Sequence, residues 1–121
     1  MAKTIMIVED VASMRGLVAI ILNTAGYHVI EACSGEDALE KLAEQKVHMI
    51  ISDVNMPSMN GLEFLKAIKT NPRYKIIPVV MLTTQGDKAT KKKGQMAGAK
   101  AWIVKPFKPE SILKVVKKII G

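Results

Sequence analysis

A chain of 121 residues has the usual length of one domain, so a single domain over residues 1–121 is expected. The composition, 49% hydrophobic and 24% charged without low-complexity tracts, excludes a disordered chain. The sequence has no secretory pattern and no apolar run near the roughly 18 residues of a membrane span, so the protein is expected to be cytoplasmic. The formal net charge of +7 is uneven, because residues 1–85 carry 8 Lys/Arg against 9 Asp/Glu while residues 86–121 carry 10 against 2.

Short apolar runs rich in β-branched residues alternate along the chain with longer segments of helical periodicity. This alternation predicts a parallel sheet covered by helices on both faces. The expected strands are Thr4–Val8, His28–Ala32, Met49–Ser52, Pro78–Leu82 and Ala101–Val104.

Five helices are expected. Apolar residues at helical spacing mark the first, and Gly26 follows it as a stop signal. The residues of its apolar face are Met14, Leu17, Val18, Ile21 and Leu22. Ser34, with Asp37 three residues later, resembles a capping box and opens the second helix. The residues expected to share one face of that helix are Leu39, Leu42 and Ala43.

The third helix is marked by Leu62, Leu65 and Ile68. The fourth, at about residues 87–97, is expected to be the weakest, because Gly94 in its interior costs about 1 kcal/mol relative to alanine. The last begins near Pro109, a residue suited to a first helical turn. Its apolar stripe consists of Ile112, Val115, Val116, Ile119 and Ile120.

Cys33 is the only cysteine and is expected to be a small buried hydrophobic residue, because no histidine or basic cluster adjoins it in the sequence. His28 and His48 lie beside the starts of strands. Neither is expected to be a ligand or a base, because the polar residues that suggest a site lie at the other ends of the strands.

Polar and charged residues follow the predicted strands at their carboxyl ends, where open α/β sheets bind ligands. They are Glu9, Asp10, Asp53, Thr83, Thr84 and Lys105. Carboxylates brought together from separate loops repel one another, and a hard divalent cation neutralises that charge. Mg²⁺ is the first candidate, because it binds through few carboxylates together with waters and phosphate oxygens, and Mn²⁺ is the alternative.

Lys105 and a threonine hydroxyl beside such a metal would form a cradle for a phosphoryl group, since each can stabilise its oxygens during transfer. Asp53 is then the expected acceptor, because a carboxylate can attack phosphorus in line and form an acyl phosphate. Each of these residues taken alone also fits an ordinary loop or surface position. The hypothesis therefore rests on their combination.

The segment DVNMPSMNG, from Asp53 to Gly61, resembles the D-x-x-M-P-x-M-x-G signature of response-regulator receiver domains. It occurs with an acidic pair after the first strand, Thr83 after the fourth and Lys105-Pro106-Phe107 after the fifth. The resemblance covers residues 4–120 and is greatest to CheY-like single-domain regulators of chemotaxis. It implies an α/β, flavodoxin-like, doubly wound fold, with a five-stranded parallel sheet of strand order 2-1-3-4-5 and five helices.

The resemblance also implies roles for the matching residues. Asp53 would accept a phosphoryl group from a phosphohistidine of a histidine kinase. Asp10, Asp53 and the main-chain oxygen of Asn55 would ligate the metal, and Glu9 would act through water. Glu9 stands where the family more often has aspartate, so the side chain is one methylene longer.

Thr83 and Lys105 would hold phosphoryl oxygens, and the Lys105-Pro106 peptide bond would be cis. Activation in such domains is a shift between two states, in which Thr83 moves toward the phosphate and an aromatic side chain on the fifth strand changes rotamer. Trp102 occupies that position, where the family commonly has Tyr or Phe. A second interpretation, that Trp102 is a partly exposed packing or interface residue, stays open.

The expected function is therefore a phosphorylation-activated switch of a two-component, chemotaxis-type system. Such a protein catalyses its own phosphoryl transfer and dephosphorylation and is not an enzyme with a separate substrate. We expect a monomer whose partners are a histidine kinase and an acidic downstream protein, such as a flagellar motor switch. The docking surface would be the fourth helix, fifth strand and fifth helix, although their lysines also fit solvated helix faces.

Other functions are compatible with parts of this pattern. A phosphorelay shuttle, or a receiver cut from a longer regulator, would use the same chemistry. A haloacid-dehalogenase-type phosphohydrolase is disfavoured, because such enzymes carry a second acid two residues after the nucleophile, where this chain has Asn55. Nucleic-acid binding is not expected, because the basic segment lacks a recognition motif with interleaved aromatic residues.

Overall fold

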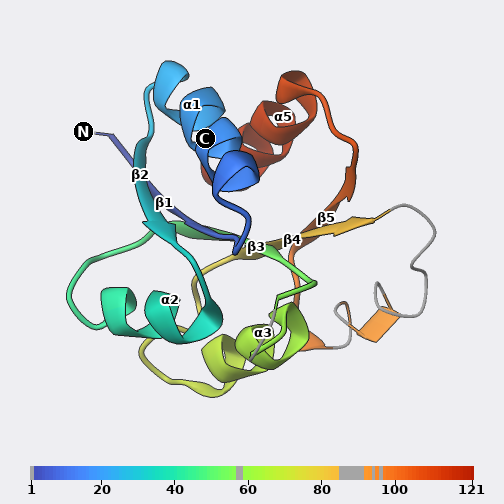
Figure 1. Ribbon diagram of the computed structural model, residues 1–121. Helices are drawn as coiled ribbons and strands as arrows, with labels where there is room; N and C mark the ends of the chain where they lie inside the picture. Colours follow the sequence, from blue (N-terminus) through green and yellow to red (C-terminus); the bar gives the residue numbers. More distant parts are fainter. Residues whose placement is uncertain (1, 57–58, 85–91, 94, 96) are drawn as a thin grey trace.

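In the computed structural model, which describes residues 2–56, 59–84, 92, 93, 95 and 97–121, five parallel strands form one sheet. The strands are β1 Thr4–Val8, β2 His28–Ala32, β3 Met49–Asp53, β4 Val79–Thr84 and β5 Ala101–Lys105. Their spatial order is β2-β1-β3-β4-β5 (Figure 1), which confirms the flavodoxin-like order that the resemblance implied. The strands β1 and β3 are therefore neighbours, and β2 and β5 form the two edges.

The described helices are α1 Ala12–Thr24, α2 Gly35–Leu42, α3 Gly61–Thr70 and α5 Pro109–Ile120. The described part of the chain thus has four helices, one fewer than predicted. The fourth expected helix, at about residues 87–97, falls mostly on residues 85–91, 94 and 96, which lie outside the described residues. Among the helices that are described, none combines the length and apolar composition that a membrane crossing requires.

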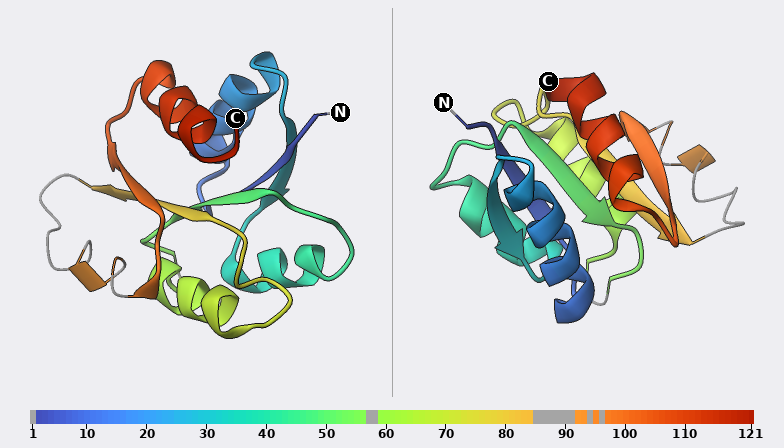
Figure 2. Two further views of the ribbon diagram at one scale, coloured as in Figure 1. Left: turned by 180° about the vertical axis from the view of Figure 1, so that it is seen from behind. Right: turned by 90° about the horizontal axis from the view of Figure 1, so that it is seen from above.

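Helices cover both faces of the sheet, α1 and α5 on one side and α2 and α3 on the other (Figure 1 and Figure 2). Alternate residues of β1 point into the two cores that result. Ile5 and Ile7 pack with residues of α1 and α5, whereas Met6 and Val8 pack with residues of α2 and α3. All four side chains are fully buried, so β1 is apolar throughout, as expected for a parallel strand covered on both faces.

Side chains cap the starts of α2 and α3. The Ser34 side chain accepts a hydrogen bond from the amide N–H of Asp37, as the sequence predicts. Asn60 and Glu63 form a capping box at the start of α3. Val11 stands at the N-cap of α1, and no side chain in the described part of the chain caps that helix. The entry into α1 must therefore be held by other contacts.

Cys33 was predicted to be buried but is exposed, so that prediction was wrong; Leu17 and Ala43, which the sequence places on apolar helix faces, are exposed as well. Leu17 is 48% exposed, because α1 packs on the sheet through a face that excludes it. The buried residues of that face are Val18, Ala19, Ile21 and Leu22. Ala43 is exposed because it follows the last residue of α2. Cys33 is exposed because it directly follows the edge strand β2, where the chain leaves the sheet toward α2.

Strands β3, β4 and β5 extend beyond their predicted ends, so Asp53, Thr83 and Lys105 are strand residues and do not follow the strands as predicted. The pairing of the sheet continues up to these positions, since Asp53 is in register with Leu82, and Thr83 with Val104. The parallel ladder therefore holds the backbone of each of these residues in place.

Gly61, the first residue of α3, lets that helix approach the end of β3 closely. A Cβ atom at this position would lie 2.3 Å from the main-chain oxygen of Asp53 and 2.6 Å from the Cα of Val54. The amide of Gly61 also donates a 2.8 Å hydrogen bond to the carbonyl of Val54. A larger residue would therefore displace the backbone that carries Asp53.

Gly61→Ala should lower the free energy of unfolding by roughly 2–3 kcal/mol, because the added methyl group overpacks against backbone atoms. Gly16→Ala is the matched control, because a Cβ at Gly16 in α1 meets no neighbouring atom within 4 Å. That substitution should raise the free energy of unfolding by about 0.5–1 kcal/mol through helix propensity. Urea-induced unfolding measures both values, and two changes of the same sign would contradict the close approach.

Candidate functional site

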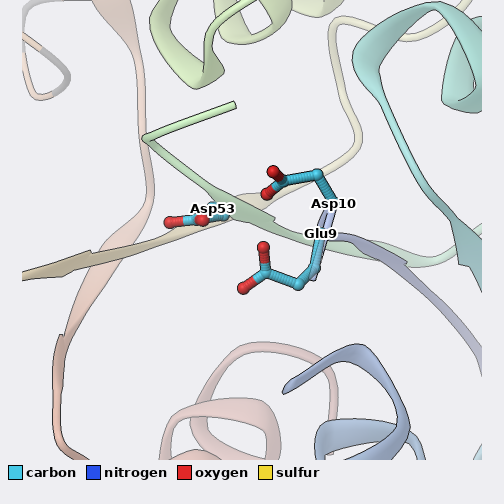
Figure 3. A group of neighbouring side chains, drawn as sticks. All are labelled: Glu9, Asp10 and Asp53. Carbon is cyan, nitrogen blue, oxygen red and sulfur yellow. The ribbon is translucent and has the colours of Figure 1, made fainter. Parts of the chain in front are cut away.

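Three carboxyl groups meet at the carboxyl ends of β1 and β3 (Figure 3). Glu9 and Asp10 directly follow β1, and Asp53 is the last residue of β3. The two strands pair side by side, with Val8 in register with Ser52. One carboxylate oxygen from each of the three acids lies within 4.8 Å of the other two. The structure thus brings together side chains that are more than forty positions apart in the sequence.

Lys105 supplies the positive charge of this cluster. Its Nζ lies 3.3 Å from Oε1 of Glu9 and 3.2 Å from Oδ1 of Asp53. Glu9 is 1% and Asp53 4% exposed, whereas Asp10 is exposed to solvent. One ammonium group facing three carboxyl groups leaves an excess of negative charge whenever all three are ionised.

That excess is reflected in the protonation of Glu9. Burial of its carboxyl group, together with the hydrogen bond and charge interaction with Asp53, raises the pKa of Glu9 from 4.5 to about 7, although Lys105 acts in the opposite direction. Burial alone would lower the pKa of Lys105, but Asp53 and Glu9 outweigh it and raise that pKa above 10.5. The cluster therefore favours an additional positive charge.

A hard divalent cation fits this donor set. Carboxylate oxygens are the ligands that Mg²⁺ and Mn²⁺ prefer, and three of them from two loops are within reach of one ion. A bound cation would also supply the charge that the proton on Glu9 supplies in its absence. The acidic cluster thus fits a divalent metal ion in its chemistry as well as in its geometry.

Two hydrogen bonds from neighbouring residues, one to the side chain and one to the main chain, define the surroundings of Asp53. The amide N–H of Asn55 donates to Oδ1 of Asp53 at 3.4 Å, and the Asn55 side chain is exposed. The Ser52 hydroxyl donates to the main-chain oxygen of Asp53 at 3.1 Å. The sequence predicts a role for Asn55 but none for Ser52, because a serine inside an apolar strand carries no signal of such a contact.

Thr83 and Trp102 lie on the same face of the sheet. Trp102 on β5 is in register with Met81 on β4, and alternation along β4 points Thr83 to the same side as Met81. Thr83 is 3% exposed. Trp102 is partly buried against the core of α2 and α3, and its indole N–H is buried without a hydrogen-bond partner among the described residues. The side chain of Thr84 lies outside the described residues.

The remaining predictions concern Pro106 and the histidines. The Lys105-Pro106 peptide bond is cis, as the resemblance implied. His28 begins β2 and His48 precedes β3, so both lie at the amino ends of the strands, opposite the carboxyl cluster, as predicted. The Nδ1 atom of His48 accepts a 3.0 Å hydrogen bond from the amide N–H of Thr4, which is a structural contact between neighbouring strands.

Arg15, like Ser52, lies near the cluster without a role predicted from the sequence. The Nη1 of Arg15 in α1 donates a 2.7 Å hydrogen bond to the main-chain oxygen of Glu9, and its Nε lies 3.3 Å from Oε1 of Glu31 on β2. The contact depends on how the chain turns between β1 and α1 and on which strand lies next to β1. Neither feature is visible in local residue spacing.

The raised pKa of Glu9 predicts that the stability of the metal-free protein depends on pH. The folded protein keeps the Glu9 proton up to about pH 7, whereas the unfolded chain loses it near 4.5. Unfolding therefore releases a proton between these values, and the free energy of unfolding should fall as the pH rises through them. The loss from this one group should be on the order of 2 kcal/mol.

Glu9→Gln should remove this contribution. Urea unfolding in EDTA at several pH values, compared between wild type and variant, isolates Glu9 because groups common to both proteins cancel. Asp37 does not interfere, because the amide N–H of Cys33 holds the pKa of Asp37 below its ordinary 3.8, outside this pH range. Parallel pH profiles for the two proteins would contradict the prediction.

Comparisons with known proteins agree with the observed fold. The family model of the response regulator receiver domain matches residues 5–117. The chain is 38% identical over 119 residues to the chemotaxis protein CheY1 of Helicobacter pylori, covering 97% of this chain and 96% of that protein. It is 34% identical over 120 residues to the phosphate regulon transcriptional regulatory protein PhoB of Klebsiella pneumoniae, covering 99% and 52%. The structure of the Vibrio cholerae chemotaxis protein CheY4 matches with a TM-score of 0.94 at 41% identity, covering 99% of this chain and 100% of that one. The chain therefore belongs to the response-regulator receiver family of two-component signalling systems and is of the CheY-like kind.

Proposed function

We propose that this protein accepts a phosphoryl group on Asp53 in the presence of Mg²⁺, and that phosphorylation changes its affinity for a partner protein. The observation that carries the proposal is the buried carboxylate of Asp53, with Lys105 Nζ at 3.2 Å and the oxygens of Glu9 and Asp10 within 4.8 Å. Membership of a family of phosphorylation-activated switches that bind Mg²⁺ in an acidic pocket supports it.

Asp53 is the proposed nucleophile. One of its carboxylate oxygens attacks the phosphorus of a histidine kinase's phosphohistidine, and the phosphorus–nitrogen bond breaks. The bonding electron pair leaves with the imidazole, which takes up a proton. Lys105 and the Thr83 hydroxyl stabilise the oxygens of the phosphoryl group as it is transferred. The domain thereby catalyses its own phosphorylation, and later its own dephosphorylation, without a separate substrate.

The proposed metal ligands are Asp10, Asp53 and the main-chain oxygen of Asn55, with Glu9 acting through a water molecule. When bound, Mg²⁺, or Mn²⁺ in its place, would offset the negative charge of the carboxylates and of the incoming phosphoryl group. Glu9 then loses the proton that it holds in the metal-free protein. Its carboxylate accepts from Lys105 and keeps that side chain directed at Asp53.

The proposed switch couples Thr83 to Trp102. These two side chains face the same side of the sheet, and Trp102 packs against the core formed with α2 and α3. Movement of Thr83 toward a phosphoryl group on Asp53 would change the space next to Trp102 and so favour a different rotamer of the indole. The surface of β5 and α5 would then change with it.

The output surface is proposed to include β5, α5 and the helix expected from the sequence at about residues 87–97, which lies mostly outside the described residues. Lys100, which directly precedes β5, and Lys118 of α5 border a hollow of about 460 Å³ between β5 and α5. The apolar residues that line the hollow are Ala101, Val115 and Ile119. Cations beside an exposed apolar hollow suit a partner with acidic and apolar side chains, such as a flagellar motor switch protein.

We further propose one monomeric, cytoplasmic receiver domain over residues 1–121. A chemotaxis role is supported by CheY1, which this chain matches over nearly the full length of both. The alternatives are a phosphorelay shuttle and a receiver from a longer regulator, and the match to about half of PhoB shows that this family also occurs in longer proteins.

Incubation with Mg²⁺ and acetyl phosphate should add one phosphoryl group to the wild-type protein and none to Asp53→Asn, as measured by intact mass. Chelation of Mg²⁺ with EDTA should abolish the modification. Asp37→Asn is the matched control, because it makes the same change at an aspartate at the start of α2, outside the carboxyl cluster. This variant should be phosphorylated like the wild type.

An unmodified wild type, with reagents that phosphorylate another receiver domain, would rule out the proposed chemistry. Sustained turnover of small phosphomonoesters would instead support a haloacid-dehalogenase-type hydrolase.

Lys118→Glu should weaken the binding of a motor-switch peptide roughly tenfold, because it places a negative charge beside an acidic ligand. Lys46→Glu, an exposed lysine outside β5 and α5, makes the same change in net charge and should have little effect. Fluorescence anisotropy of the labelled peptide, with and without beryllofluoride as an acyl-phosphate mimic, measures both. Equal affinity of the wild type in the two states would exclude the switch, and equal loss in both variants would exclude this surface.

A further inference from the structure

Arg15 joins three elements next to the acidic cluster. It lies in the first turns of α1, its Nη1 donates to the main-chain oxygen of Glu9 at 2.7 Å, and its Nε lies 3.3 Å from Oε1 of Glu31 on β2. The Arg15 side chain is largely buried, with 20% exposed, whereas that of Glu31 is 48% exposed. The guanidinium thus bridges a backbone carbonyl and a carboxylate.

The carbonyl that Arg15 binds belongs to the peptide unit between Glu9 and Asp10. The amide N–H of Glu9 still bonds to the carbonyl of Ala32, at 3.0 Å, so β1 remains attached to β2 up to that atom. The next peptide unit has left the ladder and carries both acidic side chains, one on each flanking Cα atom. A hydrogen bond to its oxygen fixes the rotation of this unit and with it the directions of the two carboxyl groups.

Among the described residues, few other contacts hold the turn between β1 and α1. No side chain in the described part of the chain caps α1, and the amide of its N-cap residue Val11 makes only a long 3.4 Å hydrogen bond to Oε2 of Glu9. The two acids on the turn repel Asp53 and each other when ionised. Without a contact from outside, this repulsion would favour a turn in which the carboxyl groups are farther apart.

An arginine suits this position better than a lysine. Its Nε and Nη donors are held in one rigid plane, so a single side chain can bond to two acceptors in different directions. Glu31 lies in the paired part of β2, in register with Ile7, so the sheet fixes the backbone position from which its side chain extends. Because the Glu31 carboxylate is half exposed to solvent, the ion pair contributes little to stability, and its consequence is the orientation of Arg15.

We propose that Arg15, oriented by Glu31, is a positioning residue that sets the geometry of the Glu9–Asp10 half of the metal site. The inference rests on the proposed metal-dependent function. Arg15 acts through the backbone and touches neither the metal nor the phosphoryl group. Its loss therefore alters Mg²⁺ affinity while leaving Asp53 and Lys105 in place.

Calorimetric titration with Mg²⁺ tests the proposal. Arg15→Ala should weaken Mg²⁺ binding about tenfold, the usual effect of removing a group that supports a ligand. Arg15→Lys should lose nearly as much, because one ammonium does not reproduce the two-acceptor geometry. Glu31→Gln should lose less, about threefold, because the contact to the Glu9 carbonyl remains.

Two further measurements separate positioning from a general structural effect. In the metal-free protein, amide hydrogen exchange at residues 9–12 should be faster in Arg15→Ala than in the wild type. At saturating Mg²⁺, the rate of phosphorylation by acetyl phosphate should return close to the wild-type value. Arg73→Ala is the matched control: Arg73 is the chain's other arginine, lies over the ring of Tyr74, and should leave all three measurements unchanged.

The outcomes distinguish this inference from the proposed function. If the wild type binds Mg²⁺ and is phosphorylated, but Arg15→Ala binds Mg²⁺ equally well, the positioning role is wrong and the function stands. Full affinity in Arg15→Lys would show that charge alone suffices and would overturn the two-acceptor geometry. If the wild type neither binds Mg²⁺ nor is phosphorylated, the proposed function itself is wrong, and the inference fails with it.

Discussion

The close approach of three carboxyl groups at one end of a parallel sheet is the constraint on which the site depends. Two unit charges about 4 Å apart repel by roughly 4 kcal/mol at an effective dielectric constant of 20, so the fold must hold these groups against their own repulsion. The pairing of β1 with β3 provides this, because it continues to Val8 and Ser52, directly before the acids. Burial on both faces of the sheet makes that pairing costly to disrupt.

Several features of the site are responses to the same repulsion. Lys105 contacts two of the acids, and Glu9 retains a proton to about pH 7. Gly61 allows α3 to pack on the main chain of Asp53 without a side chain between them. Each of these features keeps the acids close while the charge is incompletely balanced, which is the condition under which a cation binds.

The glutamate at position 9 affects the balance of charge in the carboxyl cluster through the length of its side chain. Its carboxylate reaches Lys105 through Oε1 and the amide N–H of Val11 through Oε2. The longer side chain thus bends back over the start of its own turn, and it is almost completely buried. In the metal-free protein Glu9 acts as an internal partner of the lysine, whereas the neighbouring Asp10 remains open to solvent.

The sequence predicted the strands well because their signal is local. β1 and β2 were predicted with the observed bounds, since apolar runs such as Thr4–Val8 end at charged or small residues. The ends of β3 and β5 were predicted one residue early, because Asp53 and Lys105 are polar and only the neighbouring strand shows that pairing continues.

Residue spacing did not predict the strand order, which the family resemblance implied. The general rule for parallel sheets, together with that resemblance, predicted the convergence of Glu9, Asp10, Asp53 and Lys105. The exposure of Leu17 and that of Cys33 have a common origin. Both residues are apolar, but their burial depends on which face of α1 packs on the sheet and on β2 being an edge strand. The contact between Arg15 and the Glu9 carbonyl was likewise not predictable from local sequence, because it follows from the tertiary arrangement of three elements.

The position of Trp102 gives the molecule a built-in optical probe. It is the only tryptophan of the chain, so the ultraviolet emission of the indole comes from one site on the edge strand β5. Its N–H group is enclosed without an acceptor among the described residues, and indole emission shifts in wavelength when such a group gains a polar neighbour or water. Spectra of the unlabelled protein therefore report on the side of the sheet that carries Thr83, two residues beyond the strand partner of Trp102.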